Sequence, residues 1–218
     1  MLSPQKLLSG VARERCVSKL KELPSVYLDK DTLPTVNASV LLPLCVVDGE
    51  VCLLYTLRSQ NLKNHSGQVS FPGGKMDENE NVVETALRET EEEIGVPRDR
   101  IDVWGQMAKV QGRDKNMLIT PVVGLIKDFD MKSLQCNIEE VQEVFTVPMS
   151  CFCDINNHAY LEFKKNVLPV FLYQKYKIWG ITGFITHLFL QCFLPSSIYN
   201  VDFLRKRFEM HELMPSKL

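Results

Sequence analysis

A short acidic stretch contains most of the residues that could do chemistry. Glu89, Glu92 and Glu93 are spaced at i, i+3 and i+4, so on a helix they fall on one face. Three like charges so close together destabilise a helix unless a cation neutralises them. Carboxylate oxygens are the ligands that hard divalent ions prefer, often together with phosphate oxygens of a substrate. The spacing therefore predicts a site for Mg²⁺ or Mn²⁺.

A glycine-containing loop precedes this stretch. Gly73 and Gly74 leave backbone groups free to approach a phosphate closely. Loop and carboxylates together predict metal-dependent cleavage at phosphorus, in which bound ions lower the pKa of a water and offset negative charge in the transition state. On composition alone, a solvated acidic helix surface is the simpler interpretation, and the spacing is what argues against it.

A helix over about 81–94 must position these carboxylates. Asn81 followed by Glu84 is typical of a capping box, and Gly95 stands where a C-terminal cap is expected. One stripe of this helix should face the core, and it comprises Val83, Leu87, Thr90 and Ile94. On the opposite flank, Glu84 and Glu91 surround Arg88, which predicts ordinary ion pairs on the helix surface.

Strands are expected before and after this helix. Apolar runs at 38–47 and 51–56 flank the turn residues 48–50 and predict a hairpin. Later runs predict strands at 101–110, 118–126, 142–147 and 167–173, and a helix near 180–194. This order of elements indicates a mixed α/β sandwich rather than a regular βαβ series.

Composition sets the broad class. The 218 residues are 45% apolar and 24% charged, which argues against a disordered or disulfide-stapled chain. A net charge of −2 gives no general attraction to nucleic acid or anionic lipid. The uncharged run 178–194 is short for a bilayer span and contains several polar residues, so we expect a buried helix there and no membrane span.

The segment from Gly74 to Val96 resembles the Nudix box, G-x5-E-x7-R-E-U-x-E-E-x-G-U, where U is a bulky apolar residue. The matched positions are Gly74, Glu80, Arg88, Glu89, Glu92, Glu93, Gly95 and Val96. Thr90 departs from the motif, where a large aliphatic residue is usual. The resemblance implies an α/β class Nudix-type α/β/α sandwich with a mixed sheet and a catalytic loop-helix-loop, which hydrolyses a nucleoside diphosphate linked to another moiety. It also implies metal ligation by Glu89, Glu92 and Glu93, with Arg88 orienting them, so that Arg88, Glu89 and Glu92 count as catalytic.

Residues 53–74 are similar to the extra motif of the coenzyme A diphosphatase branch, L-L-x-T-x-R-S-x3-R-x3-G-x3-F-P-G-G. Lys63 stands where that motif has arginine. The resemblance implies hydrolysis of coenzyme A, and of acyl-CoA, to 3′,5′-ADP and 4′-phosphopantetheine or its acyl form. Substrate binding would then involve Arg58, Lys63, Gly73 and Gly74. Two alternatives stay open: a Nudix hydrolase of ADP-ribose or NADH, and a catalytically silent CoA-binding module.

A second acidic run could supply a proton acceptor. Glu139, Glu140 and Glu143 stand at helical spacing, which by itself predicts a solvated helix turn. Because Nudix enzymes often take a base from outside the box, one of these three is a candidate general base.

The two ends suggest a division of the chain and a location. We expect an N-terminal helical extension at 1–34, a Nudix hydrolase domain at 36–195 and a C-terminal tail at 196–218. The tail carries Ser216-Lys217-Leu218, a peroxisomal address read by an import receptor, and we expect it to be exposed. The basic N-terminal residues are compatible with a mitochondrial presequence, the alternative location.

Overall fold

The computed structural model describes residues 3–29, 31–62, 65–163 and 166–216. Its larger sheet has the strand order β3-β2-β1-β7-β5, with β4 paired to β1, β6 to β7 and β8 to β2. The strands are β1 Val36–Val47, β2 Glu50–Arg58, β3 Val69–Ser70, β4 Gly73–Lys75, β5 Ile101–Gln106, β6 Val110–Gln111, β7 Met117–Ile126 and β8 Val141–Pro148.

This larger sheet is mixed, as predicted. β1 and β7 run parallel, with Val36 opposite Met117 and Leu44 opposite Leu125. The β1–β2 pair is an antiparallel hairpin around the predicted turn, where Val47 lies opposite Glu50. Asp48 and Gly49 both have positive φ, which is typical of a tight hairpin turn.

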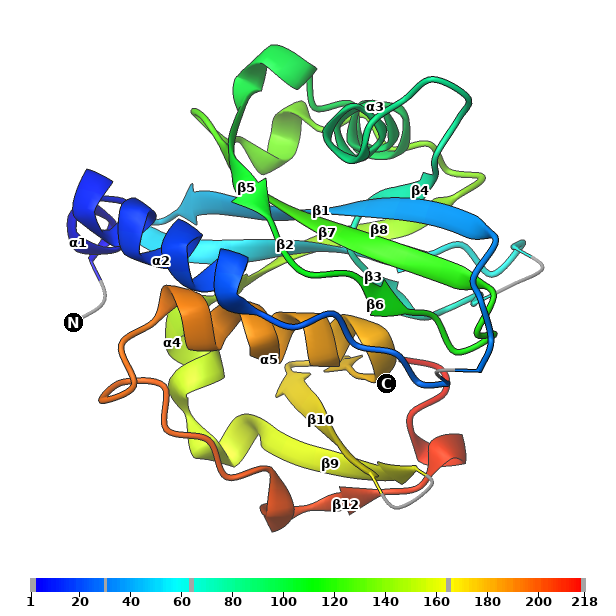
Figure 1. The fold of residues 1–218 in the computed structure, drawn as a ribbon. Helices are drawn as coiled ribbons and strands as arrows, with labels where there is room; N and C mark the ends of the chain where they lie inside the picture. The colour runs from blue at the N-terminus through cyan, green and yellow to red at the C-terminus, as the bar shows by residue number, and fades with distance from the viewer. Residues whose placement is uncertain (1–2, 30, 63–64, 164–165, 217–218) are drawn as a thin grey trace.

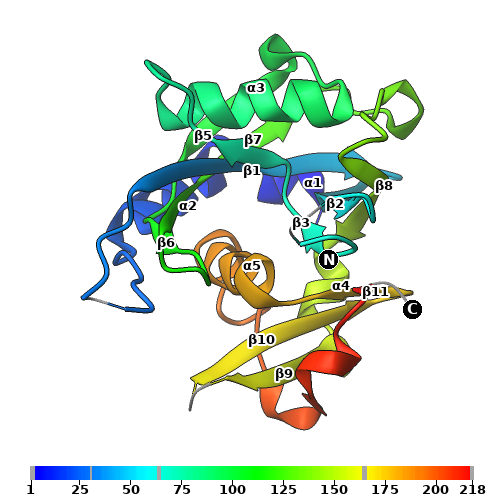
Figure 2. The same ribbon diagram turned by 90° about the vertical axis from the view of Figure 1, so that its right-hand side faces the viewer.

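Helices cover both faces of the larger sheet. Figures 1 and 2 show α3 (Val82–Ile94) on one face, and α5 (Gly180–Phe193) with α2 (Gly10–Glu22) on the other. The short helices are α1 (Pro4–Leu7) and α4 (Met149–Cys153). The predicted α/β/α sandwich is therefore confirmed.

A second, smaller sheet lies beyond α5 and was not predicted. Its strand order is β11-β10-β9-β12. The strands are β9 His158–Phe163, β10 Asn166–Tyr173, β11 Tyr176–Ile178 and β12 Arg207–Phe208. In Figure 2 this sheet encloses α5 from the side opposite the larger sheet. The fully buried Phe171 of β10 and Phe189 of α5 belong to the same core.

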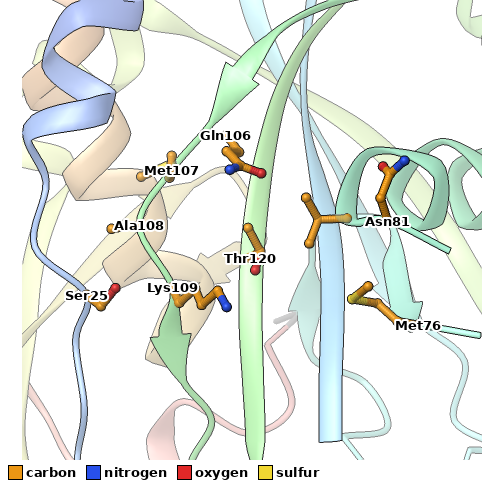
Figure 3. A pocket seen from close by; sticks show the side chains of 9 residues that line it. Ser25, Met76, Asn81, Gln106, Met107, Ala108, Lys109 and Thr120 are labelled. Carbon is orange, nitrogen blue, oxygen red and sulfur yellow. The ribbon is translucent and has the colours of Figure 1, made fainter. Parts of the chain in front are cut away.

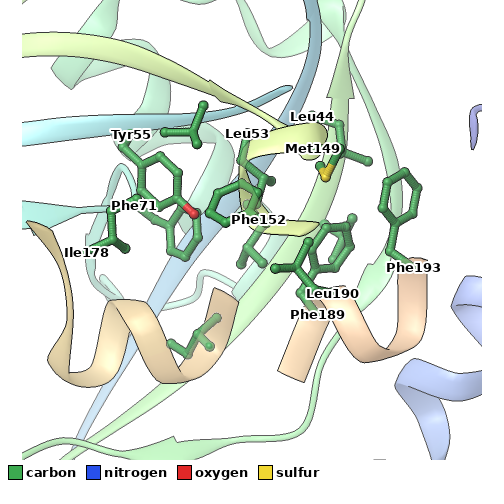
Figure 4. Packing of buried hydrophobic residues seen from close by; sticks show 14 of the residues in the cluster. Leu44, Leu53, Tyr55, Phe71, Met149, Phe152, Ile178, Phe189, Leu190 and Phe193 are labelled. Atoms are coloured by element: carbon green, nitrogen blue, oxygen red, sulfur yellow. The ribbon is translucent and has the colours of Figure 1, made fainter. Parts of the chain in front are cut away.

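The main core lies between the larger sheet and α5. Figure 4 shows aromatic and aliphatic side chains meeting there from β2, α4 and α5, among them Tyr55, Phe152 and Phe189. The Tyr55 hydroxyl hydrogen-bonds to the Thr186 hydroxyl at 2.9 Å, so the polar end of this buried ring has a partner. Ring stacking of Tyr55 on Phe71, with centroids 4.8 Å apart, extends this core toward the glycine loop.

The apolar run 178–194 contains α5, and more than half of the residues of this helix are buried, as expected. Among the described residues, no helix combines the length and the apolar character that crossing a bilayer requires.

Candidate active site

Helix α3 begins and ends where the sequence predicts. The Asn81 side chain accepts from the backbone N–H groups of Val83 and Glu84 at 2.9 and 3.1 Å, and the Asn81 N–H donates to the Glu84 carboxylate at 2.8 Å. This reciprocal arrangement is a capping box. Gly95 ends the helix in the left-handed conformation, at φ +72°. Helix α3 is therefore fixed by local interactions at both ends.

The buried face of α3 is rotated relative to the predicted stripe. Val83 and Leu87 are only partly buried, whereas Thr90 and Ile94 are fully buried as expected. The Thr90 hydroxyl donates to the Ala86 carbonyl at 2.7 Å, which satisfies its polar atom inside the core and explains how threonine occupies an aliphatic position. Glu93 lies on this buried side, with 3% of its surface exposed.

Arg88 joins the carboxylates of the loop to those of the helix. Its Nε donates to Glu80 at 2.7 Å, and its Nη1 donates to Glu89 and Glu92, both at 3.0 Å. Its Nη2 donates to Glu80 and to the Lys75 carbonyl. The ion pairs lower the pKa of Glu80 to about 2. Arg88 thus has the position needed to orient Glu89 and Glu92.

The pairing predicted for Arg88 with Glu84 and Glu91 is wrong. The Glu84 carboxylate closes the capping box, and Glu91 pairs with Arg98 at 2.8 Å. Each of these two carboxylates has a nearer partner: Glu84 bonds to the Asn81 N–H at the helix start, and Glu91 pairs with the Arg98 guanidinium. Arg88 in turn is occupied by Glu80, which reaches it from the preceding loop.

Glycines at 73 and 74 allow β4 to lie directly beneath α3. A Cβ atom at Gly74 would collide with the Glu89 carboxylate, and one at Gly73 would collide with the backbone of Ser39 and Val40. Gly73 pairs with Val40 in the antiparallel β4–β1 ladder, and its φ of +152° favours glycine. The lack of a side chain at Gly74 therefore allows its backbone to lie against the Glu89 carboxylate.

Burial changes the protonation of two box carboxylates. It raises the pKa of Glu93 to about 8, assisted by the negative charges of Glu89 and Glu140 and opposed by Arg58 and a hydrogen bond from Gly73. Burial also raises the pKa of Glu89, against the effect of Arg88. The third carboxylate, Glu92, lies at the surface, with 56% of its side chain exposed. For Glu93 and the half-buried Glu89, the cost of burying negative charge thus exceeds the stabilisation that Arg58 and Arg88 give to the ionised forms.

Arg58 ends β2 beside these carboxylates. Its Nε is buried and has no hydrogen-bond partner among the described residues. A buried donor without a partner is costly unless a ligand or solvent satisfies it, so Arg58 is suited to an anionic group entering the site. Lys63, the other predicted cation, lies outside the described residues.

Of the second acidic run, Glu140 comes nearest the box. The Asn137 N–H donates to the Glu93 carbonyl at 2.9 Å, and the Ser59 N–H donates to the Glu140 carbonyl at 2.8 Å. These bonds hold residues 137–140 between the end of α3 and the end of β2, where the charge of Glu140 acts on both Glu89 and Glu93.

The helical spacing expected for that run is wrong. Residues 138–140 form a turn, and Glu143 belongs to β8, where it pairs with Lys175 at 2.8 Å. Glu139 is exposed. Sequence spacing misleads here because the turn and strand are set by pairing of β8 with β2, which lies far away in the chain.

The donor types suit a hard divalent ion, although the carboxylates do not converge as placed. No group of three or more His, Cys, Asp or Glu side chains within residues 3–29, 31–62, 65–163 and 166–216 stands ready to hold a metal. Arg88 binds Glu89 and Glu92 together, and Glu93 faces Gly73 and Arg58 instead. As placed, the three carboxylate groups therefore have different partners.

A pocket of about 520 Å³ opens near the N-terminal end of α3 and was not predicted. Its lining comes from five separate segments: Ser25, Met76, Asn81, Val82, Gln106, Met107, Ala108, Lys109 and Thr120. Figure 3 shows Lys109 pointing from the β5–β6 connection toward Thr120, with Met76 and Asn81 on the opposite wall. Because each segment supplies only one to four residues, no local motif signals this pocket.

Comparison with known proteins agrees with the fold and the box. The family model described as "NUDIX domain" matches residues 35–167. The mouse (Mus musculus) protein named mitochondrial coenzyme A diphosphatase NUDT8 is 42% identical over 72% of this chain and 78% of its own length. The mouse peroxisomal coenzyme A diphosphatase NUDT7 is 33% identical over 82% of this chain and 77% of its own length. A crystal structure of a MutT/nudix family protein from Enterococcus faecalis superimposes with a TM-score of 0.51, at 16% identity, over 84% of this chain and 69% of that one.

Proposed function

The chain belongs to the Nudix family of hydrolases, and on that premise we propose that it splits the diphosphate bond of coenzyme A and of its acyl esters. The products would be 3′,5′-ADP and 4′-phosphopantetheine or its acylated form. One observation carries this proposal: two relatives named coenzyme A diphosphatases align over 72% and 82% of the chain. The segment that resembles the coenzyme A motif supports it, because Arg58 lies beside the box carboxylates.

Nudix hydrolases use divalent metal ions, and Mg²⁺ or Mn²⁺ is the ion we propose here. Glu89, Glu92 and Glu93 would hold it, because they offer only oxygen ligands, and at Glu89 and Glu93 the neighbouring arginines do not offset the cost of burying negative charge. When bound, such an ion supplies Lewis acidity toward the diphosphate oxygens and lowers the pKa of a coordinated water.

The protein's own groups have separate roles in this proposal. Arg88, fixed by Glu80, orients Glu89 and Glu92. Glu140 accepts the proton of the attacking water, since it is the member of the second acidic run whose charge reaches Glu89 and Glu93. The backbone at Gly73 and Gly74 lets the substrate phosphates approach the carboxylates.

Arg58 and Lys63 would bind phosphate groups of the substrate. Coenzyme A carries a 3′-phosphate in addition to its diphosphate, so it has more negative charge than metal ions at one site neutralise. The buried Nε of Arg58 can donate to a phosphate oxygen.

Product analysis tests the activity directly. Purified protein is incubated with coenzyme A and Mg²⁺ or Mn²⁺, and the products are identified by mass. We expect 3′,5′-ADP and 4′-phosphopantetheine, and none of either with a chelator present. Binding of coenzyme A by calorimetry with no product formed would instead identify a silent binding module.

A substrate panel separates this activity from its nearest rival. We expect kcat/KM for coenzyme A to exceed that for ADP-ribose, NADH and 3′-dephospho-coenzyme A. Arg58→Gln should reduce the preference for coenzyme A over the 3′-dephospho form, because a neutral amide cannot pair with the additional phosphate. Faster turnover of ADP-ribose or NADH than of coenzyme A would overturn the substrate assignment.

We propose the peroxisome as the location, with the mitochondrion as the alternative. Ser216-Lys217-Leu218 would be read by the peroxisomal import receptor, which requires Ser216 to leave the buried position that it has in the fold. The relatives include one protein named peroxisomal and one named mitochondrial. Immunofluorescence of the untagged chain, with and without these three residues, distinguishes the two, because both ends of the chain stay free. Loss of the peroxisomal signal on their removal is expected, and an unchanged mitochondrial signal would contradict the proposal.

We also propose that the chain divides into three parts. Residues 36–195 would form the hydrolase domain, 1–34 a helical extension and 196–218 a tail. The family match at 35–167 lies almost entirely within the proposed domain.

A further inference from the structure

The segment after β12 does not extend into solvent. Leu213 and Ser216 are both fully buried. The expectation of an exposed tail is therefore wrong at Ser216, while Lys217 and Leu218 lie outside the described residues. Figure 2 shows this red C-terminal segment beside β11.

The N–H, carbonyl and hydroxyl groups of Ser216 all form hydrogen bonds, and these link residues 177–179 to the turn at Gly67. Its carbonyl accepts from the Lys177 N–H at 2.7 Å, and its hydroxyl accepts from the indole Nε1–H of Trp179 at 2.8 Å. Its own N–H donates to the Gly67 carbonyl at 3.1 Å. Lys177 Nζ also donates to the Glu212 carbonyl at 2.6 Å. The segment is thus bonded to β11 on one side and to the turn at Gly67 on the other.

The turn at Gly67 is also bonded to Arg58, the arginine beside the carboxylates of α3. The Gly67 N–H donates to the Arg58 carbonyl at 3.1 Å, and the Arg58 N–H donates to the Gln68 carbonyl at 2.9 Å. Gly67 adopts φ +66°, and a Cβ atom there would lie 3.7 Å from the side chain of Pro215. A continuous series of backbone bonds therefore runs from Ser216 through Gly67 to Arg58.

We propose that residues 213–216 act as a strut that positions Arg58 for substrate, with Ser216 and Trp179 as its positioning residues. This inference rests on the proposed function, in which Arg58 binds a substrate phosphate. With the strut docked, the backbone of the Gly67 turn is held from both sides. With the strut released, the turn loses its bond to Ser216, and Arg58 loses the support that fixes its backbone. Substrate binding should weaken, while the carboxylates on α3 keep their arrangement.

Two kinds of variant test the strut in the full chain. Ser216→Arg should displace it, because a fully buried site has no room for a long charged side chain. We expect the KM for coenzyme A to rise about tenfold or more, with kcat within about twofold of wild type. Trp179→Phe removes one hydrogen bond and should raise KM about threefold to fivefold.

Trp104→Phe is the matched control, because the buried Nε1 of Trp104 has no hydrogen-bond partner in the described part of the chain. It should leave KM unchanged. Hydrogen exchange supplies a readout independent of activity: the amides of Lys177 and Ser216 should exchange faster in Ser216→Arg, while those of α3 do not.

The possible outcomes distinguish failure of the proposed function from failure of the strut. If wild-type protein fails to cleave coenzyme A, the proposed function is wrong, and the exchange measurement alone judges whether the strut is docked. If wild type cleaves coenzyme A but both variants keep the wild-type KM, the strut has no positioning role. A loss of thermal stability with KM unchanged would likewise overturn it, because it would reduce Ser216 to a purely structural residue. A KM that rises more for coenzyme A than for 3′-dephospho-coenzyme A supports a role exerted through Arg58.

Discussion

Glu93 combines burial with a position among other carboxylates, and this sets it apart from the other acidic residues of α3. Its pKa is raised to about 8, chiefly by burial. In the unfolded chain a glutamate titrates near 4.5. Because the folded form favours the protonated acid, the contribution of Glu93 to metal-free stability is complete below about pH 4.5 and is lost as the pH rises through about 8.

Glu93→Gln should therefore have opposite effects on stability and on turnover. The amide cannot ionise, so the Tm of the variant with a chelator present should match wild type near pH 5 and exceed it by a few degrees near pH 8. With Mg²⁺ and coenzyme A, kcat should fall by about 100-fold or more, because a metal ligand is lost. Thermal unfolding across this pH range and steady-state kinetics measure the two effects.

Glu91→Gln provides the control on the same helix. Glu91 pairs with Arg98 at the surface, where 43% of its side chain is exposed, and the pair contributes little. Its replacement should leave both the pH profile of Tm and kcat near wild type. Retention of most activity in Glu93→Gln would remove Glu93 from the metal-binding set.

At the scale of elements, the capping box makes α3 a rigid support for the site. Asn81→Ala removes the acceptor for the N–H groups of Val83 and Glu84. The free energy of unfolding should fall by about 1 kcal/mol. Denaturant titration measures this change. Asn81→Asp keeps an acceptor and adds a negative charge at the helix N-terminus, so it should be as stable as wild type or more so. Equal losses in both variants would show that the side-chain acceptor at residue 81 is not the source of the stabilisation.

Elements with strong local signals are predictable from sequence. The bounds of α3 follow from Asn81, Glu84 and Gly95, which form their interactions within a few residues of one another. The β1–β2 hairpin follows from its turn residues in the same way. The Nudix box locates Glu89, Glu92 and Glu93 by spacing alone.

Elements set by distant contacts are not predictable in this way. Glu143 lies on a strand because β8 pairs with β2, and residues 137–140 are held by bonds to Glu93 and Ser59. Glu93 is buried because β4 passes beneath the helix at Gly73. The hydrophobic periodicity of α3 cannot predict this contact, because β4 is a separate element. Ser216 is enclosed because β11 and the Gly67 turn meet there.

At the scale of the whole molecule, the N-terminal helices are part of the main core. Cys16 and Leu20 of α2 are buried in the same cluster as Leu44 and Phe189. Arg13 forms a two-pronged ion pair with Asp102 of β5, at 2.8 and 3.1 Å, and its guanidinium lies 5.6 Å from the centre of the Trp104 ring. Helix α2 therefore packs against both α5 and the edge of the larger sheet, and the proposed extension at 1–34 supports the hydrolase fold mechanically.

Leu20→Ala measures how much the core depends on α2. Leu20 is 2% exposed, so its truncation leaves a cavity between α2 and α5 and should lower the free energy of unfolding by about 2–5 kcal/mol. Val11→Ala, on the same helix with 78% of Val11 exposed, should change it by less than about 0.5 kcal/mol. Denaturant unfolding of both variants gives the comparison. If Leu20→Ala unfolds with wild-type stability, α2 is only loosely attached and its removal by a processing protease would leave the hydrolase intact. If the expected loss occurs, α2 is an integral part of the core, and its removal would expose the surfaces of α5 and β5 that it now covers.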